Sequence, residues 1–123
     1  MDAARTRILP AFAAAVVLAL ILLAGASGAS ASTTRTCSTP TYPSTGYFTS
    51  LEVTGTDCAT GRKLALAYFK CRTKGGNLAG VCHGLVLGFT CHELRNSIPT
   101  EIDARVTCKR KGEVVVHTYQ QNL

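Results

Sequence analysis

The sequence predicts an α+β fold: a small disulfide-stapled domain with one helix packed on a roughly four-stranded sheet, in the order β-α-β-β-β. Three observations lead to this class. Residues 55–71 have helical periodicity and carry Cys58 and Cys71 near their two ends. Segments with the two-residue alternation of strands lie on both sides of this helix. The chain also holds six cysteines, an even number that is typical of disulfides in a short exported protein.

Export is indicated by the first 31 residues, which have the features of a secretory signal peptide. Arg5 and Arg7 supply the positive start, and residues 8–24 form an apolar run broken only by a proline. Cleavage is expected after Ala29-Ser30-Ala31, with Ala24-Gly25-Ala26 as the second choice. An uncleaved membrane anchor is the alternative, but the apolar run is shorter than the ~20 residues that span a bilayer. We therefore expect a secreted protein.

The exported part of the chain is basic. The whole sequence has 13 Lys and Arg against 7 Asp and Glu, and removal of Asp2, Arg5 and Arg7 with the leader leaves a net charge of +5. Such a charge favours weak association with polyanions such as envelope polymers, anionic lipid or nucleic acid. The alternative is that the charge only keeps a small protein soluble.

Residues 32–46 are rich in Ser, Thr and Pro, which indicates an extended arm rather than a regular element. Cys37 would tie this arm to the body of the protein. Residues 47–54 alternate as a first strand does and end at a glycine. The sequence from 47 to 123 contains no internal repeat, so we expect it to form a single disulfide-stabilised domain.

The predicted helix has start and stop signals. Thr56 or Asp57 can cap its first turn, and Lys70 and Arg72 near its end suit the helix dipole. Gly61 is unfavourable inside a helix by about 1 kcal/mol relative to Ala. Close packing of the helix on the sheet would explain its presence.

Three more strands are predicted after the helix. In chain order the sequence indicates a loop at 73–80, a strand at 85–91, a loop at 92–100, a strand at 102–108, a hairpin turn at 109–112 and a strand at 113–119. The alternation is clearest in the strand at 102–108, where Asp103, Arg105 and Thr107 are expected to face outward.

This topology suggests one disulfide pairing among the many that six cysteines allow. If the first strand runs upward, the helix descends and the next strand rises, which places Cys58 and Cys91 at the top. The expected pairs are Cys58–Cys91, Cys71–Cys82 and Cys37–Cys108. Cys58–Cys108 and Cys91–Cys108 are the alternatives if the order of the strands differs. No metal site is expected, because no two cysteines have the spacing of a zinc knuckle.

The same topology places six cations at one end of the molecule. Three lie at the end of the helix and three in the hairpin turn: Lys70, Arg72, Lys74, Lys109, Arg110 and Lys111. We expect this basic pole to bind an anionic cell-envelope polymer or an acidic protein, with no cofactor and with nucleic acid less favoured. The chain is expected to be a monomer. The alternative is two solvated turns that are basic by coincidence.

An ordered set of short motifs carries a resemblance to a family. The motifs are Gly55-Thr56-Asp57-Cys58-Ala59-Thr60-Gly61-Arg62-Lys63, Leu87-Gly88-Phe89-Thr90-Cys91, Arg105-Val106-Thr107-Cys108 and the segment from Val114 to Tyr119. This order resembles uncharacterised small secreted cysteine-containing proteins of high-GC Gram-positive bacteria. Those proteins have a Cys-Ala-Thr-Ala-Arg helix, a Gly-Phe-x-Cys strand and a Val-Thr-Cys hairpin. The resemblance covers residues 47–121, departs at Gly61, and implies export and disulfides but no catalytic residues.

No catalytic residue is predicted from the sequence itself. His83, His92 and His117 have unrelated spacing, which is typical of surface or hairpin histidines. A small basic nuclease would use His92 and Glu93 as acid and base, but adjacent residues of a strand point to opposite faces. The sequence also lacks a Gly-x-Ser-x-Gly motif and a phosphate-binding glycine loop.

A protein-partner module, such as a protease inhibitor, is the second functional hypothesis. Small disulfide-rich scaffolds suit that role because a stapled loop is held ready for its partner. Residues 96–100, between Cys91 and Cys108, are the candidate loop. A non-enzymatic binding module with a basic pole remains the first hypothesis, and a nuclease is the third.

Overall fold

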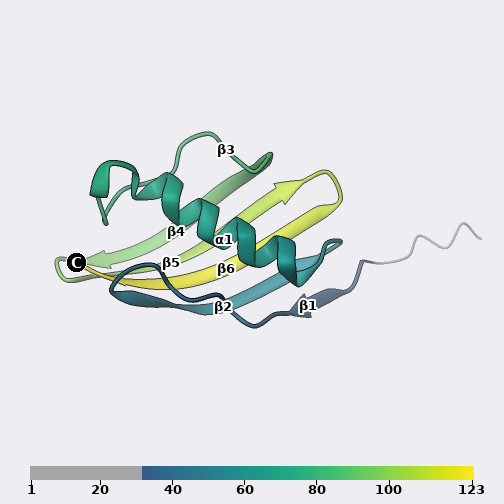
Figure 1. Cartoon of the computed structure of the whole chain (residues 1–123), viewed down its shortest axis with the longest axis horizontal. Helices are drawn as coiled ribbons and strands as arrows, with labels where there is room; N and C mark the ends of the chain where they lie inside the picture. The colour runs from purple at the N-terminus through teal and green to yellow at the C-terminus, as the bar shows by residue number, and fades with distance from the viewer. Residues whose placement is uncertain (1–31) are drawn as a thin grey trace, which may run out of the picture.

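The computed structural model describes residues 32–123, and the predicted signal peptide at 1–31 lies outside the described residues. One antiparallel sheet is crossed on one face by a single α-helix (Figure 1). The elements in chain order are β1 (Thr34–Thr36), β2 (Gly46–Thr54), α1 (Cys58–Arg72), the short 3₁₀ turn η1 (Lys74–Gly76), β3 (Leu85–Val86), β4 (Phe89–Ile98), β5 (Glu101–Arg110) and β6 (Glu113–Asn122). The α+β class with disulfides is confirmed, but the sheet has six strands and not four.

The order of the strands in the sheet is β1-β2-β6-β5-β4-β3. β4, β5 and β6 follow one another as antiparallel hairpins, and β2 pairs with the other side of β6. Burial alternates along these strands: in β5, every second residue from Ile102 to Cys108 is buried. Asp103, Arg105 and Thr107 lie between them on the other face, as predicted. The sheet therefore has a covered face under α1 and an open face turned away from it.

The connections between strands differ from the prediction in two places. The expected strand at 85–91 is divided by a tight turn, in which Leu87 and Gly88 have positive φ of 50° and 79°. The expected loop at 92–100 is mostly strand β4. Pro99 does not interrupt β4, because it lies in the turn to β5, where no hydrogen bond of the ladder is required of its nitrogen.

The molecule has a hairpin end and an opposite end. At the hairpin end, the turn between β5 and β6 lies beside the start of α1, and Gly55 there packs against the backbone of Gly112. At the opposite end, α1 finishes near the turn between β4 and β5 and near the last residues of β6 (Figure 1). α1 therefore runs almost the whole length of the sheet.

The core lies between α1 and the covered face of the sheet. Asp57 caps the helix, as expected, by accepting a hydrogen bond from the Thr60 backbone nitrogen at 2.7 Å. The buried side chains of the helix include Leu64 and Tyr68, and they pack with apolar residues of all four long strands. A Cβ atom on Gly61 would approach Val53 to 2.6 Å, so the glycine does allow the close packing that its position suggested.

Three disulfides join Cys37 to Cys58, Cys71 to Cys82 and Cys91 to Cys108. The Cys71–Cys82 pair is the one expected. The expected Cys58–Cys91 and Cys37–Cys108 pairs are wrong, and Cys91–Cys108 was among the alternatives.

The reason for these errors is the direction of two segments. Residues 73–84 carry the chain back along the sheet outside the ladder, before the short strand β3, so β4 descends rather than rises. Cys91 therefore lies opposite Cys108 in the register. The arm folds back beside β2 through β1, which brings Cys37 next to the start of α1 rather than to the other end.

Candidate functional site

The open face of the sheet is the candidate site. Side chains that point away from α1 form four rows across β2, β6, β5 and β4. From the opposite end to the hairpin end, the register gives the rows Tyr47-Gln120-Asp103-Asn96, Ser50-Thr118-Arg105-Leu94, Glu52-Val116-Thr107-His92 and Thr54-Val114-Lys109-Thr90. Most of these side chains are polar, and no helix or loop of the described chain forms a second layer over them (Figure 1).

Cations on this face lie along β5 and in the turn that follows it. Arg105 and Lys109 stand two rows apart on β5, and Lys111 lies in the turn that follows. We call these three residues the basic strip. Thr90, His92 and Thr107 surround its Lys109 and Lys111, and together they line a shallow depression. The depression contains no acidic side chain.

The basic strip forms no ion pair within residues 32–123. Within residues 32–123, the ion pairs are Glu93–Arg95 and Arg110–Glu113, each with a nitrogen–oxygen distance of 2.8 Å. None of the strip residues takes part in either pair. Its charges are therefore available to an external anion.

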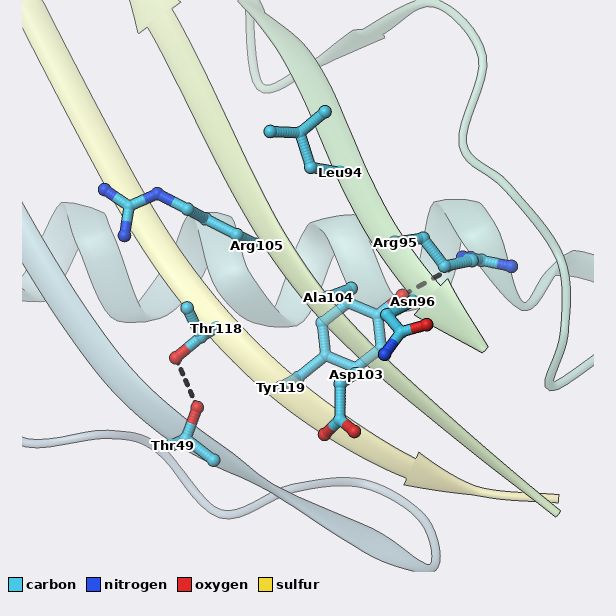
Figure 2. A pocket seen from close by; sticks show the side chains of 9 residues that line it. All are labelled: Thr49, Leu94, Arg95, Asn96, Asp103, Ala104, Arg105, Thr118 and Tyr119. Carbon is cyan, nitrogen blue, oxygen red and sulfur yellow. Dashed lines mark hydrogen bonds between the residues drawn. The ribbon is translucent and has the colours of Figure 1, made fainter. Parts of the chain in front are cut away.

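A second depression adjoins the basic strip on the same face (Figure 2). We call it the polar hollow. It is lined by Thr49, Leu94, Arg95, Asn96, Asp103, Ala104, Arg105, Thr118 and Tyr119. Figure 2 shows the side chains of Asp103 and Asn96 next to each other, and that of Arg105 extending away from Asp103 across β6. Arg105 thus belongs to both the hollow and the strip.

The side chains of the hollow differ in whether they already have partners. Thr49 and Thr118 are hydrogen-bonded to each other, and Arg95 is bonded to Glu93 and Tyr119 behind the sheet. In the described part of the chain, the side chains of Asn96, Asp103 and Arg105 are found in none of the hydrogen bonds or ion pairs. These three side chains offer a carboxylate, an amide and a guanidinium to a ligand.

The predicted basic pole is wrong, because its six cations lie at two ends of the molecule. Lys70, Arg72 and Lys74 lie at the opposite end, whereas Lys109, Arg110 and Lys111 lie at the hairpin end (Figure 1). The 15 residues of α1 separate the two groups by about 22 Å. The prediction placed the hairpin at the wrong end because it reversed the direction of β4.

Two of the six cations also serve the fold rather than the surface. Arg72 is only 2% exposed and donates to the carbonyl oxygen of Leu78 at 2.6 Å. Arg110 lies 4.2 Å from the centre of the Phe89 ring and pairs with Glu113, and this hydrogen bond lowers the pKa of the Glu113 carboxyl. Arg72 is therefore not accessible to a partner, and Arg110 is already paired with Glu113.

The acid–base pair that a nuclease would use does not form. His92 lies on the open face, and Glu93 lies on the covered face with its side chain only 5% exposed. Glu93 accepts hydrogen bonds from Arg95 and from the Tyr119 hydroxyl there. Burial, with this hydrogen bond, raises the pKa of Tyr119, so the phenol stays protonated. The network is internal to the fold.

The candidate inhibitor loop at 96–100 is also not a loop. Asn96 to Ile98 pair with β5 as the end of β4, and only Pro99 and Thr100 form the turn.

His117 is not a surface residue: it is 1% exposed, and burial lowers its pKa from 6.5 to about 3. Among residues 32–123 no group of three or more His, Cys, Asp or Glu is arranged to hold a metal ion.

Sequence reasoning missed Thr118 and Thr49 as members of a site, and it assigned Asn96 to the candidate inhibitor loop rather than to a face of the sheet. The outward orientation of Asp103 and Arg105 was predicted from alternation, but their neighbours depend on which strands pair with β5. The alternation over residues 92–98 gives no signal for Asn96, because Asn96 shares a face with the apolar Leu94 and Ile98, which that pattern would turn toward the core. In the structure Leu94 and Ile98 are exposed, at 65% and 57%.

Comparison of the chain with protein-family models, curated proteins and solved structures finds no match. Among the residues that the structure describes, no helix is both long enough and apolar enough to cross a membrane.

Proposed function

We propose that this chain is an exported, non-enzymatic binding module whose open sheet face binds an anionic polymer of the cell envelope. The observation that carries the proposal is the basic strip: Arg105, Lys109 and Lys111 lie on one face without an ion pair in the described chain. The signal-peptide features of residues 1–31 and the three disulfides support export.

Electrostatics favour a polymer over a single small anion. Exposed cations each contribute little to binding in water, because solvent and salt screen them. A chain of repeated negative charges can contact several cations at once, and the hydroxyl groups of Thr90 and Thr107 add hydrogen bonds beside them. The affinity then depends on the number of contacts and falls with ionic strength.

The test uses protein exported from the full chain and purified in its oxidised form from the culture medium. It is applied to purified cell envelopes and eluted with a salt gradient. The variant with Lys109→Ser and Lys111→Ser is compared with the variant with Lys70→Ser and Lys74→Ser. Both variants lose two positive charges, but the second loses them at the opposite end of the molecule.

We expect salt to elute the wild type, and the Lys109/Lys111 variant to bind roughly 3- to 10-fold more weakly. The Lys70/Lys74 variant should stay close to the wild type. Equal weakening of both variants would show that only net charge matters, and absent retention would reject the proposal. Retention that salt does not reduce would instead favour a protein partner.

A further inference from the structure

The polar hollow beside the basic strip indicates which class of anionic polymer the open face would bind. We propose that the polymer is an acidic polysaccharide, whose negative groups lie on the basic strip while a sugar unit occupies the polar hollow. This inference rests on the proposed function, and it adds a second contact of a different kind. The residues that carry it are Asn96, Asp103 and Arg105, which have free side chains, and Leu94.

The negative charge of Asp103 favours one class of anionic polymer over another. Its carboxylate is exposed on the face that the proposal assigns to an anion, and it has no ion pair within residues 32–123. A carboxylate only accepts hydrogen bonds. A polyphosphate at neutral pH also only accepts them, so it would be repelled at this point. A polysaccharide carries hydroxyl groups that donate, and these satisfy a carboxylate.

The neighbours of Asp103 complete a set of groups suited to sugar hydroxyls. Asn96 lies directly opposite Asp103 in the register and supplies both donors and an acceptor. Arg105 follows two residues later on the same face, about 7 Å along β5, and supplies only donors. Leu94, 65% exposed and opposite Arg105, offers an apolar surface to the C–H groups of a ring.

The hollow and the strip are continuous through Arg105. Lys109 lies four residues further along the same face of β5, a distance of about 14 Å. A ligand that reaches both Asp103 and Lys109 must therefore be longer than one sugar unit. A polysaccharide with negative groups at intervals meets this requirement.

The test compares two soluble probes at the same salt and the same charge concentration: polygalacturonate, which has hydroxyls and carboxylates, and linear polyphosphate. Binding of each is measured by titration calorimetry to the oxidised exported protein. The variants are Asp103→Ala, Asn96→Ala and, as the matched control, Glu52→Ala. Glu52 is an acidic residue of the same face that does not line the hollow.

We expect Asp103→Ala to weaken binding of polygalacturonate about 10-fold, because a hydrogen-bond acceptor is lost. The same variant should bind polyphosphate more tightly, because a repelling charge is lost. Asn96→Ala should weaken binding of polygalacturonate alone, and Glu52→Ala should slightly strengthen binding of both probes.

If Asp103→Ala strengthens binding of both probes as Glu52→Ala does, the hollow is not a sugar site. The inference then fails while the proposed function stands. If neither probe binds the wild type at low salt, the inference fails as well, and retention on whole envelopes shows separately whether the proposed function survives.

Discussion

Arg72 and Gln121 join the end of α1 to the end of β6: Arg72 Nη2 donates to Gln121 Oε1 at 2.9 Å. Both side chains are buried, with exposed fractions of 2% and 0%. Gln121 Nε2 in turn donates to the carbonyl oxygen of Thr45 at 2.8 Å. The guanidinium of Arg72 also lies 4.3 Å from the centre of the Tyr119 ring. The buried side chain of Gln121 therefore connects α1, β6 and the arm.

Arg72→Met should test this connection. Methionine retains an apolar stem but removes every donor, which leaves Gln121 Oε1 and the Leu78 carbonyl oxygen without the Arg72 hydrogen bonds. We expect the free energy of unfolding to fall by about 2–3 kcal/mol in urea titrations at pH 7. Lys70→Met, an exposed change on the same helix, should stay within about 0.5 kcal/mol of the wild type. Equal urea midpoints for the Arg72 and Lys70 variants would contradict the role of Arg72 as a connection between α1 and β6.

His117 should make stability depend on pH. The imidazole is packed against Phe48, Tyr68 and Tyr119, with ring centres 5.9, 5.5 and 6.5 Å away, and neither nitrogen has a hydrogen-bond partner within residues 32–123. Burial, aided by the positive charge of Arg72, lowers its pKa from 6.5 to about 3. The histidine is therefore neutral in the folded protein, while the unfolded chain takes up a proton below pH 6.5.

The sign of this effect follows from the direction of the shift. Stability contributed by neutral His117 is complete above pH 6.5 and is lost as the pH falls from 6.5 toward 3, by up to about 1.4 kcal/mol per pH unit. His117→Leu should flatten the fall in unfolding free energy measured between pH 6.5 and 4. A variant whose curve stays parallel to the wild type would show that His117 does not titrate as described.

Gly61→Ala should destabilise the protein although alanine is the better helix former. The added methyl group would lie 2.6 Å from Val53 Cγ1 and 3.4 Å from Leu51 Cδ1, and these side chains are 1% and 0% exposed. We expect a loss of about 1–3 kcal/mol by urea titration, because overpacking exceeds the gain of about 1 kcal/mol in helix propensity. Lys63→Ala, at an exposed helix position, is the control. A stabilised Gly61 variant would show that α1 can move away from β2.

The Cys37–Cys58 disulfide should hold the arm. Replacing both cysteines by serine should reduce the free energy of unfolding by about 3 kcal/mol. Hydrogen exchange should accelerate mainly at Thr34–Thr36, since β4, β5 and β6 keep their own pairing. Peptide mapping of the non-reduced protein should recover Cys37 linked to Cys58. Recovery of Cys37 linked to Cys108 would contradict the fold of the arm.

Local pattern predicted much of the fold. The cap at Asp57, the helix, and the inward and outward residues of β5 were all foreseen, because each depends on side chains within a few positions of one another. The turn at Leu87 and Gly88 was not foreseen, because leucine seldom adopts the positive φ that it has there. Pro99 led to the wrong prediction of a loop at 92–100. The sequence around a proline does not show whether it interrupts a strand or lies in the turn after the strand, and Pro99 lies in the turn.

The candidate site was less predictable than the fold. Alternation placed Asp103 and Arg105 outward, but the hollow also needs Asn96 from β4 and Thr118 from β6. The register of three strands brings those partners together. Backbone hydrogen bonds hold this register, and because they are the same for every residue type, the sequence gives no direct sign of which residues lie opposite each other. The cations of the basic strip all lie on β5 or in the turn that follows it, so their grouping is local in sequence. The pairing of β4 with β5 decided that Thr90 and His92 lie beside Lys109.

The amino-acid sequence by itself determined the fold class, the cysteine count, the helix with its cap, and which side chains of β5 face solvent. These properties follow from composition and from the 3.6-residue and two-residue periods. Only the tertiary structure decided the direction of β4, two of the three disulfide pairs and the separation of the six cations. Those depend on how residues 73–84 return across the sheet, and that path is selected by packing of the whole core rather than by any local pattern.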